Sequence, residues 1–104
     1  MQYVINILAY FESIITQSNV ANRLINSIFL NLFTHMLKNM KSHMIKIKVC
    51  SIVGLLIRHA TVIDNDVAKS GVRELLIQTL NDSNDLVRRK AIASLGEYLF
   101  YAAT

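Results

Sequence analysis

The stretch NDSNDLVRRKAIASLGEYLFYAAT, from Asn81 to Thr104, closes the chain and decides the fold. Its first residues, NDSND, are typical of a tight turn that also caps a helix. Asp85 then suits the positive end of the helix dipole. Apolar residues follow every three or four positions, as on one buried helix face, at Val87, Ala91, Leu95, Leu99 and Ala102. We therefore predict a helix here with those residues inside.

The same helical period marks four earlier segments. We expect the first to end near Gln17, the second to form one long helix through Met40, and the third to start after an N-cap at Ser42. Residues 64–66, with the sequence DND, offer caps for the fourth helix. No segment alternates apolar and polar residues as a strand does. The sequence predicts an all-α fold of five helices.

Two glycines indicate a repeat. Gly54 and Gly96 lie 42 residues apart, each inside a helix, and the same shift aligns Lys46 with Arg88 and Lys48 with Lys90. Helix pairs with a period of about 40–47 residues are the signature of HEAT or armadillo arrays. A glycine inside a helix costs about 1 kcal/mol relative to alanine, which is tolerable where two helices approach closely. We therefore expect Gly54 and Gly96 at contacts between repeats.

The predicted architecture is a right-handed α-α superhelix. Residues 1–18 form an orphan helix, residues 20–61 one repeat and residues 65–104 a second repeat. Gly71 lies near the start of the fourth helix, where we expect a tolerated surface residue.

The last helix pair resembles a HEAT repeat through Leu75, Leu76, Leu80, Asp82, Val87, Arg88, Ala91, Leu95 and Gly96. The resemblance implies that Asp82 and Arg88 take part in a polar ladder that ties successive repeats. In the middle repeat Lys46 matches Arg88, but Met40 stands where the aspartate would be. We therefore expect the ladder to be broken there.

The end of the chain is also similar to the C-terminal helical-repeat region of the fourth unc-51-like (Runkel-type) kinase and pseudokinase family. The matching residues are Arg88, Arg89, Leu95, Gly96, Glu97, Leu99, Phe100 and Tyr101, whereas Tyr98 replaces the usual leucine. The resemblance implies a fragment of a kinase tail that does no chemistry itself. It also implies a cytoplasmic protein associated with the cytoskeleton or with cilia.

Composition agrees with a folded domain that packs against further structure. The 104 residues are 53% hydrophobic and 17% charged, and the single cysteine cannot form an internal disulfide, which fits the cytoplasm. The sequence has no signal peptide and no run of about 18 apolar residues that would span a membrane. Aromatic residues crowd both terminal helices, and we expect these uncovered helices to self-associate: Tyr3, Tyr10, Phe11, Tyr98, Phe100 and Tyr101.

The middle of the chain is basic. No acidic residue lies between Ser13 and Ile63, and this region supplies the candidate partner-binding residues Lys38, Lys41, Lys46, Lys48 and Arg58. Such a face favours a protein partner with an acidic surface. The alternative is a binder of nucleic acid or anionic lipid through the same second and third helices. Nucleic acid has less support, because Phe29 and Phe33 fall on buried stripes and cannot stack on bases.

No catalytic or cofactor motif is present. The chain lacks a phosphate-binding glycine loop and a nucleophile elbow, and its three histidines and Cys50 do not have zinc-ligand spacing. The triplet Arg88–Arg89–Lys90 could contact phosphates, but we expect Arg88 in the ladder and the other two in solvent. The sequence predicts neither an enzyme nor a metal or cofactor site.

Overall fold

The computed structural model describes residues 2–15, 17–25, 28–60 and 71–103. Every regular element in these ranges is a helix: α1 (Gln2–Ile14), α2 (Ser18–Ile25), α3 (Ile28–Asn39), α4 (His43–His59), α6 (Val72–Thr79) and α7 (Asp85–Ala103). The all-α prediction is therefore confirmed for the described residues. The caps expected at residues 64–66 lie outside them.

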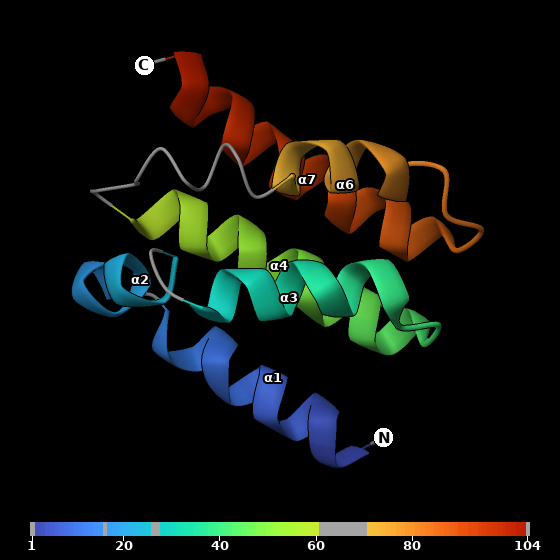
Figure 1. The fold of residues 1–104 in the computed structure, drawn as a ribbon, viewed down its shortest axis with the longest axis horizontal. Coiled ribbons are helices and arrows are strands. Elements are labelled where there is room, and N and C mark those ends of the chain that lie inside the picture. The colour runs from blue at the N-terminus through green and yellow to red at the C-terminus, as the bar shows by residue number, and fades with distance from the viewer. Residues whose placement is uncertain (1, 16, 26–27, 61–70, 104) are drawn as a thin grey trace.

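The prediction that the second segment forms one long helix is wrong. The segment consists of α2 and α3, whose axes run in different directions in Figure 1. The intervening Asn26 and Ser27 lie outside the described residues, but both are residue types whose side chains compete with helical hydrogen bonds. The described residues thus contain six helices, one more than the predicted total of five.

The helices form two layers around a shared core. In Figure 1, α3 and α6 lie in front of α4 and α7. Helix α4 is central, because it packs against α1, α2, α3 and α7. The core includes large side chains that are fully buried, among them Ile15, Ile25, Phe33, Val49, Ile52, Leu56 and Leu76. Burial of such side chains supplies most of the driving force for this arrangement.

Local chemistry sets the helix starts. The hydroxyl of Ser42 accepts the backbone N–H of Ile45 at 3.4 Å, which confirms the predicted N-cap of α4. The side chain of Asn84 accepts the N–H of Val87 at 3.1 Å at the start of α7. Gly71 precedes α6 with a φ of 81°, a left-handed conformation that favours glycine. Gly71 is therefore more than a tolerated surface residue.

The two aligned glycines differ in their surroundings. A Cβ on Gly54 would lie 2.8 Å from the hydroxyl oxygen and 3.3 Å from the Cα of Ser94, so α4 and α7 approach closely there. A Cβ on Gly96 would meet no atom of the described residues within 4 Å. The expected contact is therefore present at Gly54, whereas Gly96 is exposed.

The buried face of α7 is rotated from the predicted one. Val87 and Ala91 are fully buried as expected, but Leu99 is 54% exposed and Ala102 is exposed. Ser94 is buried in their place, with its hydroxyl donating to the backbone carbonyl of Cys50 on α4. The period alone missed Ser94, because a buried serine is tolerated only when its hydroxyl has such a partner.

Candidate functional site: the polar links and the groove between α3 and α6

Asp82, in the turn between α6 and α7, joins the two helix pairs. Its carboxylate accepts a hydrogen bond from Lys46 Nζ on α4 at 2.6 Å and another from the backbone N–H of Asn84 at 2.9 Å. These hydrogen bonds, that of Lys46 first, lower the pKa of the Asp82 carboxyl. Arg88 donates to the backbone carbonyl of Asp82 at 2.8 Å. The Asp82–Arg88 contact thus runs through the main chain, while Lys46 holds the carboxylate.

A second polar link joins α1 to α4. Glu12 on α1 accepts a hydrogen bond from Lys48 Nζ at 2.9 Å and another from the Ser51 hydroxyl at 2.7 Å. The side chains of Lys48 and Glu12 are only 30% and 22% exposed, so water screens this pair less than a surface pair. Polar links therefore join α4 to α1 on one side and to the turn before α7 on the other. They form although Met40 stands where the sequence comparison expects the counterpart of Asp82.

These links use two of the predicted partner-binding residues. Lys46 and Lys48 are both held by internal carboxylates. Lys38 on α3, Lys41 before α4 and Arg58 near the end of α4 are exposed, and none pairs with a carboxylate within the described parts of the chain. Lys38 faces α6, whereas Arg58 lines a pocket beside α7. The five cations therefore do not form one continuous basic face.

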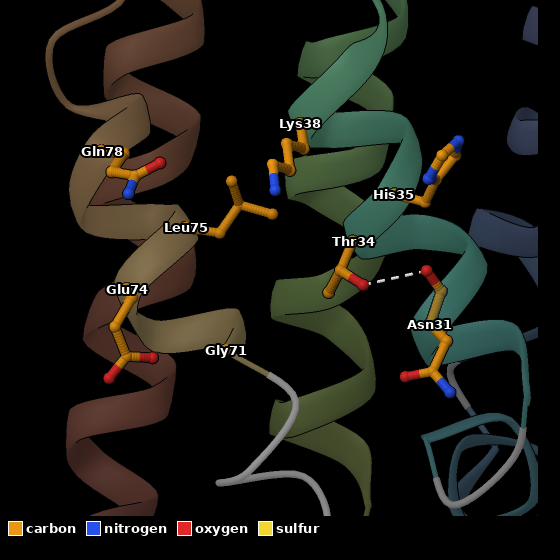
Figure 2. Close-up of a pocket in the computed structure, with 8 residues that line it drawn as sticks. All are labelled: Asn31, Thr34, His35, Lys38, Gly71, Glu74, Leu75 and Gln78. Atoms are coloured by element: carbon orange, nitrogen blue, oxygen red, sulfur yellow. Dashed lines mark hydrogen bonds between the residues drawn. The ribbon is translucent and has the colours of Figure 1, made fainter.

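A groove of about 370 Å³ separates α3 from α6 (Figure 2). Its lining consists of Asn31, Thr34, His35, Lys38, Gly71, Glu74, Leu75 and Gln78. Lys38 and Leu75 point toward one another across it, whereas His35 points away from α6. The hydroxyl of Thr34 is used within α3, where it donates to the carbonyl of Asn31 at 2.9 Å. Within the described parts of the chain, the groove therefore offers one ammonium without a carboxylate partner, that of Lys38, beside the apolar side chain of Leu75.

The groove continues along α6 toward Asp82. An adjoining pocket of about 210 Å³ shares Lys38, Leu75 and Gln78 with the first and reaches Lys46 and Asp82. Together they follow the seam between the two helix pairs. Such an elongated seam, with an ammonium midway along it, can accommodate an extended peptide that carries an acidic side chain.

The carboxylate at the groove is already paired. Glu74 bonds Arg73 at 3.0 Å, and its own backbone N–H, followed by Arg73, lowers the pKa of its carboxyl. Glu74 therefore remains ionised near neutral pH. Arg73 offsets part of its charge.

The described residues offer no metal centre, since no three His, Cys, Asp or Glu side chains in them gather closely enough to hold an ion. Cys50 is fully buried, and burial raises the pKa of its thiol to about 12. It is therefore a protonated core side chain rather than a reactive thiolate. None of the helices in the described ranges is long and apolar enough to cross a membrane.

The basic triplet divides into three environments. Arg88 contacts Asp82 and Asp85, and Arg89 pairs with Asp85 at 3.0 Å. Lys90 is half-buried and lines the pocket between α4 and α7, contrary to the expectation that it lies in solvent. The cause is the rotated face of α7, which turns Lys90 toward α4.

Sequence reasoning missed the polar partners Glu12, Ser51 and Ser94. A signal for Glu12 existed, because the 42-residue shift that aligns Gly54 with Gly96 also aligns Glu12 with Gly54. No comparable signal distinguishes Ser51 or Ser94 from exposed serines on a helix.

Comparison with known proteins agrees with the kinase resemblance. The chain is 37% identical over 99 residues to the serine/threonine-protein kinase RUNKEL of Arabidopsis thaliana. The match takes in 95% of this chain, which spans only 7% of the length of RUNKEL. Neither a protein-family model nor a solved structure matches the chain. The similarity extends far beyond the C-terminal stretch and takes in nearly the whole chain.

Proposed function

We propose that this chain is a non-catalytic, protein-binding segment from the tail of an unc-51-like kinase or pseudokinase, built of stacked HEAT/armadillo-type helix pairs. The observation that carries the proposal is the pairing of α3 with α4 and of α6 with α7, linked across the pairs by Lys46 and Asp82. The match to a small part of a kinase supports it. Such stacks form extended surfaces suited to binding proteins.

The partner in this proposal is a protein with an acidic surface. Lys38 supplies the free charge in the groove, and Leu75 supplies apolar area beside it. An acidic peptide that lies in the groove would pair its carboxylate with Lys38. We further propose a cytoplasmic location near the cytoskeleton or cilia, which rests on the family resemblance alone.

Binding of nucleic acid or anionic lipid is the weaker candidate. It would need many unpaired cations on one face, since each neutralised phosphate contributes a separate electrostatic gain. Lys46 and Lys48 are paired internally, Lys38 and Arg58 line separate grooves, and Lys41 lines neither of them.

The test is fluorescence anisotropy with a labelled hexaglutamate peptide, compared with a labelled oligothymidine and with phosphatidylserine vesicles. We expect the peptide to bind, and the Lys38→Met protein to bind it about fivefold more weakly, as for the loss of one charge-assisted hydrogen bond. Lys41→Met, an exposed lysine outside the groove, is the matched control. Tighter binding of oligothymidine or vesicles, with a steep loss on adding salt, would favour the alternative.

A further inference from the structure

A pocket between α4 and α7 carries an inference of its own. It has a volume of about 250 Å³, and its lining includes Gly54, Arg58, Lys90 and Glu97. It lies apart from the groove between α3 and α6, and no residue lines both. Within the described residues, neither Lys90 nor Arg58 has a carboxylate partner.

The seam between α1 and α4 is the counterpart of this pocket, and it contains a carboxylate. Glu12 occupies the seam between those two helices and accepts from Lys48 of α4. The 42-residue shift carries Glu12 to Gly54 and Lys48 to Lys90. Leu8 on α1 and Ile15 directly after it flank Glu12 and are buried, and so are their counterparts Cys50 and Ile57. The shift therefore relates the two seams in structure as well as in sequence.

One component differs between the two seams. In the first, Lys48 meets the carboxylate of Glu12. In the second, the equivalent Lys90 lines a pocket at Gly54, and a glycine at this position supplies no carboxylate. Gly54 cannot carry a carboxylate itself, because even a Cβ would lie 2.8 Å from the Ser94 hydroxyl oxygen. Glu97 of α7 lines the pocket, but within the described residues it forms no ion pair with Lys90 or Arg58, so the pocket can take a further carboxylate from another molecule.

We propose that the pocket between α4 and α7 binds a single carboxylate, the side chain of a glutamate or aspartate on a partner protein, through Lys90 and Arg58. The proposal rests on the proposed function, since it assumes a protein partner, and names the chemistry that a second site on the segment recognises. Leu55 and Ala93 in the pocket wall supply apolar contact for the methylene groups of the acidic side chain.

Glu97 limits what the pocket accepts. It also lines the pocket and brings one negative charge to the two positive charges of Lys90 and Arg58. Two cations and one carboxylate leave a net charge of one, which matches one incoming carboxylate rather than a dianionic phosphate. Removal of the Glu97 charge should therefore strengthen binding.

The test is an NMR titration of the ¹⁵N-labelled 104-residue chain with capped glutamate, acetyl-glutamate methylamide. Capped glutamine serves as the neutral control. We expect shifts of the Gly54, Ala93 and Ser94 amides with capped glutamate only. Lys90→Met should weaken binding about fivefold, Glu97→Gln should strengthen it about twofold, and Lys41→Met, at an exposed lysine that lines neither groove nor pocket, should leave it unchanged. Circular dichroism of each variant checks that the fold is kept.

Two results would overturn the inference: equal shifts from capped glutamine, or unchanged affinity in Lys90→Met. If either result were found and hexaglutamate binding still depended on Lys38, the proposed function would stand and only the proposal for this pocket would be wrong. If hexaglutamate bound to neither the groove nor the pocket, the proposal of an acidic protein partner would be wrong.

Discussion

Gly54 and Gly96 lie 42 residues apart at positions that the sequence shift aligns, and they meet opposite surroundings. Gly54 is buried against Ser94, whereas Gly96 is exposed and faces no described atom within 4 Å. Their neighbours differ in the same way, since Cys50 and Ile57 are buried but their counterparts Ile92 and Leu99 are 59% and 54% exposed. A repeated sequence pattern thus specifies a surface that can receive a helix. Whether it is covered depends on the presence of the next helix.

The largest expected effect comes from filling the close contact. Gly54→Val should lower the free energy of unfolding by about 2–3 kcal/mol, because the added carbons overlap Ser94 and force α4 and α7 apart. Gly96→Val is the matched control and should change it by less than about 0.5 kcal/mol. Urea unfolding followed by circular dichroism measures both. Equal losses in the two variants would mean that the helices do not approach at Gly54.

The exposed counterpart surface should cause self-association. Substitution of Ile92 and Leu99 by glutamate places charges on the uncovered face and should raise the dissociation constant between copies at least about tenfold, or about 1.4 kcal/mol. Ser83→Glu, an exposed turn position, is the control. Sedimentation equilibrium reports the constants. A wild-type chain that stayed monomeric at high concentration would contradict this prediction.

The polar link at Asp82 should contribute less. Asp82→Asn removes the ion pair with Lys46 and should lower the free energy of unfolding at pH 7 by about 1 kcal/mol. Because the fold lowers the pKa of Asp82 from 3.8, this contribution is full above that value and disappears as pH falls through the lowered pKa. The difference between wild type and variant should therefore vanish in acid.

Asp85 offers the control for that experiment. Its side chain is 62% exposed and, among the residues that the structure describes, pairs only with Arg88 and Arg89 of its own helix, so Asp85→Asn should change stability by only a few tenths of a kcal/mol. Urea unfolding at pH 7 and at about pH 1.5, below the lowered pKa of Asp82, measures both variants. A difference for Asp82→Asn that persisted at low pH would show that the ion pair is not its source.

The smallest expected effect has the opposite sign. Gly96→Ala should raise the free energy of unfolding by about 0.5–1 kcal/mol, since alanine restricts the unfolded chain and meets open space in the folded one. Thermal unfolding at low protein concentration detects the gain. A loss of stability in the monomer would show that Gly96 has a neighbour.

Much of the helical framework could be predicted from periodicity. Ser42, Val87 and Ala91 occupy the positions that their spacing indicates. The period could not show that α7 turns Ser94 inward instead of Leu99, because that choice depends on the carbonyl of Cys50 on another helix. Lys46 and Lys48 resembled solvent-exposed cations for the same reason. Their carboxylate partners lie 36 residues away, and only the packing of the helices brings them together.

Labelling of Cys50 can measure how often the interface between α4 and α7 opens. Cys50 is the only thiol of the chain, fully buried where α4 meets α7, and its raised pKa keeps it protonated. Alkylating reagents attack thiolates, so labelling must wait until the two helices separate and water reaches the sulfur. The labelling rate in native buffer therefore reports the free energy of opening this interface, without a substitution in the chain and without denaturant.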